Sequence, residues 1–155
     1  MDIAIEVTKT FQSTASVERV FSILSDVPLS VSHYPDVESL EDLGGGAYQW
    51  NLRELGAAGI RHQIVYGCHY VSDAQAGTIT WRPVEGLGNA RIAGHWRLTA
   101  DDAGTGIDFY NQGTLSIPIP RLLKSVGVPF VQAAFSSQID TYLANLERTF
   151  EVSVP

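Results

Sequence analysis

The sequence predicts an α+β fold in which an antiparallel sheet packs against one long helix close to the C-terminus. Apolar residues recur at three- and four-residue spacing at the end of the chain, which indicates an amphipathic helix of about five turns. This stripe consists of Val131, Phe135, Ile139, Tyr142, Leu143, Leu146 and Phe150. The region before it, from about residue 37 to 116, alternates in hydrophobicity and is divided by turn residues. Because the sheet is the only large surface available to the helix, the two should pack together. A curved sheet wrapped on one helix often leaves interior space, so a pocket is the leading functional hypothesis.

The first elements are a strand and a short helix. Residues 3–11 alternate with period two, which is typical of a strand with one buried face. Hydroxyl groups that can cap a helix follow at Ser13, Thr14 and Ser16, before apolar residues with helical spacing over 17–24. Asp26-Val27-Pro28 ends this helix, and the residues up to Pro35 have room for no more than a turn or two of helix.

Six further strands are separated by glycine- and aspartate-rich turns. Short turns between consecutive strands favour an antiparallel meander, since parallel strands need long crossover connections. The predicted strands lie near residues 37–43, 47–55, 60–72, 77–83, 89–100 and 106–116.

Strand alternation predicts an inner face that is rich in large aromatic residues with a polar tip. Such a mixture of apolar walls and a few polar groups is typical of small-molecule pockets. The alternative is that these aromatics simply fill a wide core. With three positions of the closing helix, the candidate ligand-binding residues are Tyr48, Trp50, His62, Tyr66, Trp81, Trp96, Phe109, Asn111, Phe135, Ile139 and Tyr142.

The apolar segment from Ile117 to Pro129 precedes the closing helix. Pro120 fits the first turn of a short helix, and Gly127 and Pro129 are expected to break or kink the chain. We therefore interpret Pro120, Gly127 and Pro129 as a gate over the pocket. A hydrophobic connection packed on its own domain is an equally good interpretation.

Length and charge limit the class of protein. The 155 residues suit one domain, residues 1–155, and the net charge of −7 argues against a general nucleic-acid or anionic-membrane binder, although a local basic patch is compatible with it. Cys68 has no partner for an internal disulfide, and we expect a buried free thiol. No signal-peptide pattern and no apolar run of about 20 residues is present, so we expect a cytoplasmic protein without a membrane-spanning segment.

Three segments carry a family resemblance. They are STASVERVFSILSDVPLSVSHYPDV, GTITWRPVEGLGNARIAGHWRLTAD and PFVQAAFSSQIDTYLANLERTFE. With them the chain resembles the polyketide cyclase/dehydrase and lipid-transport group of the START-related (SRPBCC, Bet v 1-like) superfamily. The resemblance implies a helix-grip fold: a seven-stranded curved antiparallel sheet around a long C-terminal helix, with two short helices after the first strand. It also implies a cavity for a lipid, sterol, quinone or polyketide.

Two functions of different classes follow, and a third is weaker. The first is a carrier or sensor that binds a hydrophobic small molecule. The second is a cyclase or dehydratase in which His62, the one histidine that alternation points inward, acts as acid or base. The third is a protein-interaction module. The histidines have no cysteine or carboxylate at ligand spacing, so we expect neither a metal site nor a cofactor.

Overall fold

The computed structural model describes residues 1–57 and 60–152, and nine strands are assigned in these ranges. In chain order they are β1 (Asp2–Ser13), β2 (Val37–Gly44), β3 (Ala47–Leu52), β4 (Leu55–Ala57), β5 (Ile60–His62), β6 (Val65–Asp73), β7 (Thr78–Gly88), β8 (Ala90–Asp101) and β9 (Gly104–Ser116). Seven of them form one antiparallel sheet with the order β1-β9-β8-β7-β6-β3-β2, and β4 pairs with β5 in a separate two-stranded sheet. The predicted seven-stranded α+β architecture is confirmed.

Two short helices follow β1, and a long one ends the described chain. They are α1 (Val17–Ser25), α2 (Val27–Val31) and α3 (Lys124–Phe150), with a 3-10 turn, η1 (Arg121–Leu123), directly before α3. The Ser16 hydroxyl accepts a hydrogen bond from the Arg19 amide at 3.2 Å, which confirms the predicted capping of α1. Asp26 caps α2 in the same way, through the amide of Leu29 at 3.2 Å.

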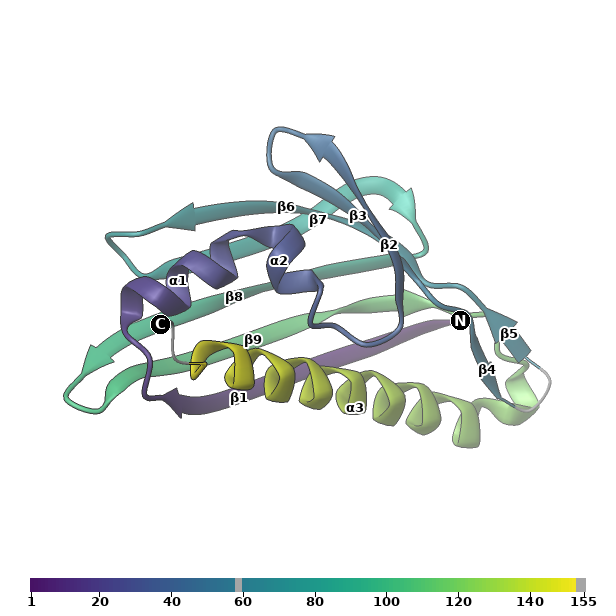
Figure 1. Ribbon diagram of the computed structural model, residues 1–155. Helices are drawn as coiled ribbons and strands as arrows, with labels where there is room; N and C mark the ends of the chain where they lie inside the picture. The colour runs from purple at the N-terminus through teal and green to yellow at the C-terminus, as the bar shows by residue number, and fades with distance from the viewer. Residues whose placement is uncertain (58–59, 153–155) are drawn as a thin grey trace.

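The sheet curves around α3, and α1 and α2 lie at the far end of the same face (Figure 1). The core lies between these layers, where Ile139 and Leu146 of α3 are at most 1% exposed, as are Ile79 and Ile107 of the sheet. Full burial of such a side chain stabilises the folded state by about 1.5–3 kcal/mol. No helix among the described residues is long and apolar enough to span a membrane.

Two of the predicted strands are shorter than expected. The predicted strand 47–55 ends at Leu52, and the predicted strand 60–72 is divided into β5 and β6. The Asn89 side chain explains the second break. It forms hydrogen bonds with backbone groups at residues 63 and 65 that would otherwise pair with a neighbouring strand. It accepts from the Val65 amide at 2.9 Å and donates to the Gln63 carbonyl at 2.8 Å.

The closing helix starts earlier than the sequence predicts. The expected break at Gly127 and Pro129 is wrong, because α3 continues through both residues. Pro129 lies about one turn from the helix start, so its missing N–H removes a single helical bond, to the Ser125 carbonyl. Gly127 serves close packing: a Cβ at this position would be 3.0 Å from Cγ2 of Ile119.

Candidate functional site

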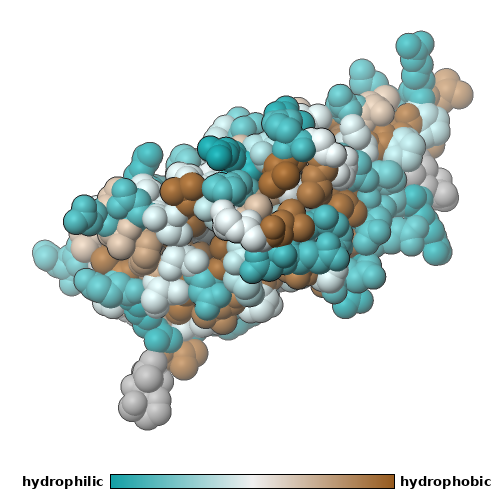
Figure 2. Space-filling model, turned by 90° about the horizontal axis from the view of Figure 1, so that it is seen from above, coloured by the Kyte–Doolittle hydropathy of each residue, from teal (hydrophilic) through white to brown (hydrophobic). Residues whose placement is uncertain are grey.

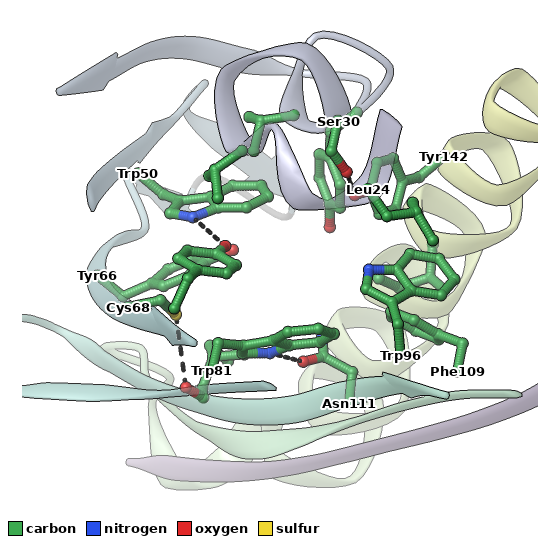
Figure 3. A pocket seen from close by; sticks show the side chains of 16 residues that line it. Leu24, Ser30, Trp50, Tyr66, Cys68, Trp81, Trp96, Phe109, Asn111 and Tyr142 are labelled. Atoms are coloured by element: carbon green, nitrogen blue, oxygen red, sulfur yellow. Dashed lines mark hydrogen bonds between the residues drawn. The ribbon is translucent and has the colours of Figure 1, made fainter. Parts of the chain in front are cut away.

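An interior cavity of about 30 Å³ lies between the sheet, the α1–α2 pair and the middle of α3 (Figure 3). A space of this size holds about one or two water molecules. The residues that line it are Leu24, Val27, Ser30, Val31, Tyr34, Trp50, Tyr66, Cys68, Tyr70, Trp81, Ile92, Trp96, Phe109, Asn111, Ile139 and Tyr142.

Aromatic rings form most of the cavity wall, and they support one another. Trp50 stacks on Tyr66, with ring centroids 5.4 Å apart and planes inclined by 18°. On the opposite side, Trp96 packs on Phe109 at a centroid distance of 4.6 Å. Aromatic pairs of this kind contribute about 0.5–1.5 kcal/mol beyond the burial of their area, so the rings hold one another in place.

Two of the three indole nitrogens in the wall have a partner. Trp50 Nε1 donates to the Tyr70 hydroxyl and Trp81 Nε1 donates to Asn111 Oδ1, both at 3.0 Å. The indole nitrogen of Trp96 points toward the open space and takes part in no hydrogen bond among the side chains drawn in Figure 3. Trp96 is 3% exposed as a residue, and its N–H borders the cavity space; among the described residues, the buried side-chain polar atom without a partner is His69 Nδ1.

Helices α2 and α3 close the cavity through two hydrogen bonds. The hydroxyl groups of Ser30 and Tyr142 bond to each other, and the Tyr34 hydroxyl donates to Gln138 Oε1 at 3.2 Å. The Tyr34 ring also meets Trp50 edge-on, with centroids 5.3 Å apart. Tyr34 therefore connects α3 to the sheet across the top of the cavity.

The cavity is electrically neutral over the physiological pH range. Burial raises the pKa of Tyr34, Tyr66, Tyr70 and Tyr142 above the ordinary value for tyrosine. Burial also raises the pKa of the Cys68 thiol to about 12, which fits the predicted buried free cysteine. Among the described residues, none that lines the cavity is a histidine, carboxylate, lysine or arginine. The site can therefore bind apolar surface and offer neutral hydrogen bonds, and it holds no group that ionises near pH 7.

Eight of the predicted ligand-binding residues line the cavity together. They are Trp50, Tyr66, Trp81, Trp96, Phe109, Asn111, Ile139 and Tyr142. Tyr48 instead faces an outer hollow beside α2, and Phe135 lines an open groove between α3 and the β1–β9 edge. Whether any of these residues contacts a ligand stays a prediction.

His62 does not share the inner face of β6, and the expectation of one continuous strand is wrong at this point. It belongs to β5, which pairs with β4 outside the large sheet, and its Nε2 lies 2.9 Å from Nδ2 of Asn89. The break at residues 63–64 interrupts the alternation that pointed His62 inward. His62 is therefore absent from the cavity lining, and its catalytic role stays a prediction without contact to this site.

The predicted gate residues lie away from the cavity. Pro120 precedes η1, and Gly127 and Pro129 lie in the first turns of α3. The lining residue of α3 nearest to them is Ile139, about 15 Å further along the helix at 1.5 Å per residue.

The cavity wall next to solvent is formed by residues that strand alternation did not select. Val31 and Tyr34 line both the cavity and the outer hollow, which has a volume of about 260 Å³. Ser30, Val31 and Tyr34 come from α2 and the turn after it, where no period of two or 3.6 residues can be read. The Tyr34-Pro35 pair within the resembling segment was the one signal for this wall.

Comparison with known proteins identifies the family. The model of the family described as polyketide cyclase/dehydrase and lipid transport matches residues 4–151. The chain belongs to this family. The resemblance to the START-related superfamily is thereby confirmed, and no protein with curated annotation matches the chain by sequence.

Several solved structures share the fold of this chain at low sequence identity. Zhui aromatase/cyclase from Streptomyces sp. R1128 is 17% identical, with a TM-score of 0.66 over 97% of this chain and 94% of the other. TTHA0849 from Thermus thermophilus is 19% identical, with a TM-score of 0.65 over 95% and 96%. A START superfamily protein from Mycobacterium smegmatis is 14% identical, with a TM-score of 0.64 over 94% and 97%. At these identities the likeness shows the fold.

A metal site in the described part of the chain would need a particular arrangement of side chains. No group of three or more His, Cys, Asp or Glu side chains within residues 1–57 and 60–152 is arranged to hold a metal ion.

Proposed function

We propose that the protein binds a hydrophobic small molecule in the interior cavity, as a carrier or sensor. A lipid, quinone, sterol or polyketide-like compound fits the neutral, ring-lined wall. The observation that carries the proposal is the Trp96 indole N–H, which points into the cavity without a partner in the wall. A donor that borders the cavity favours a ligand with a carbonyl or hydroxyl oxygen, because such an oxygen accepts a hydrogen bond worth about 0.5–1.5 kcal/mol.

Ligand entry requires the wall between the cavity and the outer hollow to move. Small-molecule pockets usually measure about 300–1,000 Å³, far more than the interior space. The cavity of about 30 Å³ and the hollow of about 260 Å³ would together approach roughly 300 Å³ if Val31 and Tyr34 moved aside. We therefore place the entrance between α2 and β3, rather than at the apolar segment before α3.

Tryptophan fluorescence tests the proposal directly, because all three tryptophans of the chain line the cavity. Titration with a naphthoquinone, a sterol and oleic acid should give saturable quenching or a shift for at least one of these compounds. Native mass spectrometry of the same sample should show one bound molecule per chain. A protein that binds none of them, and that carries no compound from its own cell, would contradict the proposal and favour an interaction module.

Replacement of Trp96 by phenylalanine tests the donor. Trp96→Phe removes the free N–H and keeps an aromatic ring, so we expect roughly tenfold weaker binding of a quinone, corresponding to about 1.4 kcal/mol. The free energy of unfolding should change by less than the affinity, because the N–H bonds to nothing in the wall. Tyr110→Phe, which alters a hydroxyl bonded to Glu6 on the outer side of the sheet, is the matched control. Equal affinity of the wild type and Trp96→Phe would show that the Trp96 N–H does not bond to the ligand.

The alternative is a cyclase or dehydratase activity, which the family description names beside lipid transport. Such an enzyme needs an acid or base beside the substrate, and the cavity wall offers tyrosine hydroxyls and no ionisable group near pH 7. His62→Ala tests the form of this alternative in which His62 is the acid or base. A carrier should keep its affinity, whereas an enzyme that depends on His62 should lose turnover by orders of magnitude with the fold intact.

A further inference from the structure

The segment from η1 to the second turn of α3 exposes apolar side chains that the fold leaves uncovered. Leu122 is 95% exposed, Val126 71% and Phe130 47%, and four-residue spacing places Val126 and Phe130 on one side of α3. Leu122 and Val126 are the two most exposed large hydrophobic residues among those that the structure describes. The alternative interpretation of this segment as a connection packed on its own domain is therefore wrong at these positions. We call Leu122, Val126 and Phe130, with Arg121 and Lys124, the tip surface.

The tip surface has a charge opposite to that of the whole molecule. Residues 109–139 include Arg121 and Lys124 and contain no aspartate or glutamate, in a protein whose net charge is −7. Neither cation takes part in either of the two salt bridges found in the described part of the chain.

The tip surface lies at one extremity of the molecule. Figure 1 places the start of α3 beside β4, β5 and the N-terminus, at the end away from the C-terminus. Figure 2 shows a different face of the molecule, seen from above, on which hydrophobic side chains gather in the middle and hydrophilic ones surround them. An end of the molecule can meet a flat surface without a clash from the rest of the fold.

From these observations we propose that the tip surface docks the protein on an anionic lipid bilayer. Exposed leucine, valine and phenylalanine enter the boundary between headgroups and acyl chains, while the flanking cations meet anionic headgroups. The excess negative charge elsewhere repels the same bilayer, so the protein binds with this end toward the lipid. A second copy of the chain is a poorer occupant, because a two-fold contact would place Arg121 and Lys124 close to their own copies. This surface is separate from the interior cavity, and its docking does not depend on the proposed function.

Vesicle flotation with the full chain tests the proposal. Vesicles of phosphatidylcholine with phosphatidylserine should carry the protein, and vesicles of phosphatidylcholine alone should carry much less. Each cation near the surface raises binding roughly fivefold, so the double variant R121Q/K124Q should bind more than tenfold more weakly. The triple variant L122S/V126S/F130S should bind at least as weakly, and added salt should release the wild type.

Matched controls alter the same residue types elsewhere on the surface. L43S/V71S removes two exposed apolar side chains, and R82Q/R97Q removes two exposed cations, so both should bind like the wild type. All the substituted side chains are exposed, and the urea midpoint of every variant checks that the fold is kept. The proposal is overturned if the wild type ignores phosphatidylserine, or if the control variants lose binding equally. A wild-type dimer that L122S/V126S/F130S converts to a monomer, seen by sedimentation, would overturn it in favour of self-association.

Discussion

The hydroxyl groups of Tyr142 and Ser30 bond to each other inside the core and join α3 to α2. Tyr142→Phe should lower the free energy of unfolding by about 1–3 kcal/mol, because it leaves the buried Ser30 hydroxyl without this partner. Urea unfolding measures the change. Tyr110→Phe is the control, since the hydrogen bond from Tyr110 to Glu6 is exposed and its loss should cost less than about 0.5 kcal/mol. Equal losses of unfolding free energy in the two variants would show that the buried hydrogen bond stabilises the fold no more than the exposed one does.

At the scale of residues, sequence reasoning succeeded where a regular period holds. Trp96, Phe109 and Asn111 alternate along β8 and β9, and all three are buried on the inner face as predicted. Ser30 and Tyr34 were missed because they lie in and after a five-residue helix, where burial follows no period. The alternation that pointed His62 inward does not hold, because the predicted strand is divided where the Asn89 side chain bonds Gln63 and Val65.

At the scale of elements, β8 depends on a glycine where a cavity ring crosses it. A Cβ on Gly94 would lie 2.7 Å from Trp81 Cζ2 and 2.1 Å from the Tyr110 carbonyl oxygen. Gly94→Ala should therefore displace Trp81 and destabilise the protein by about 1–3 kcal/mol. Chemical denaturation and the tryptophan emission maximum measure both effects.

A neighbouring glycine provides the control for this prediction. Gly106 of β9 has ordinary space around it, because a Cβ on this residue would lie 3.6 Å from the Thr99 carbonyl oxygen. Gly106→Ala should therefore change stability by less than about 0.5 kcal/mol. If the two alanine variants were equally stable, close approach of Trp81 to β8 would not limit the residue at position 94.

Among the elements, those with long periodic patterns were predictable and the local exceptions were not. Alternation located the strands of the large sheet, and the apolar stripe located the C-terminal part of α3. The extension of α3 through Pro129 follows from the position of the proline close to the helix start, which no single pattern reveals. The β4–β5 pair was not predicted as a separate sheet, because β5 was included in the predicted strand 60–72 and Gly56 of β4 was assigned to a turn.

For the whole molecule, the buried tyrosines predict loss of stability at high pH. Burial raises the pKa of Tyr34, Tyr66, Tyr70 and Tyr142 above the ordinary value near 10, and it raises the pKa of Tyr48 in the same direction. A group whose pKa is raised in the folded state contributes its full stabilisation of the fold below its unfolded-state pKa. This contribution is lost as the pH rises from the unfolded-state pKa through the folded-state pKa. Cys68, with a pKa of about 12 in the fold, acts in the same direction above its ordinary value of 9.0.

The contribution of these tyrosines and of Cys68 to the free energy of unfolding should consequently be constant up to about pH 9 and fall steeply above it. Urea titrations at several alkaline pH values measure this change. Ultraviolet absorbance of the phenolate gives an independent readout, because the four buried tyrosines should ionise only as the chain unfolds. Ionisation of all six tyrosines in the folded protein near pH 10 would contradict the burial on which this prediction rests.

The order of the strands has a consequence for how the chain is made. β1 leaves the ribosome well before β9, its partner in the sheet, since Asp2 pairs with Ser116. At typical synthesis rates of about 5–20 residues per second, β1 waits roughly 5–25 s for that partner. During this interval its row of Ile3, Ile5 and Val7 has no sheet to join, so the nascent chain presents an unpaired apolar strand. Chaperones that bind short apolar segments should therefore hold this protein by β1 until β9 has been translated.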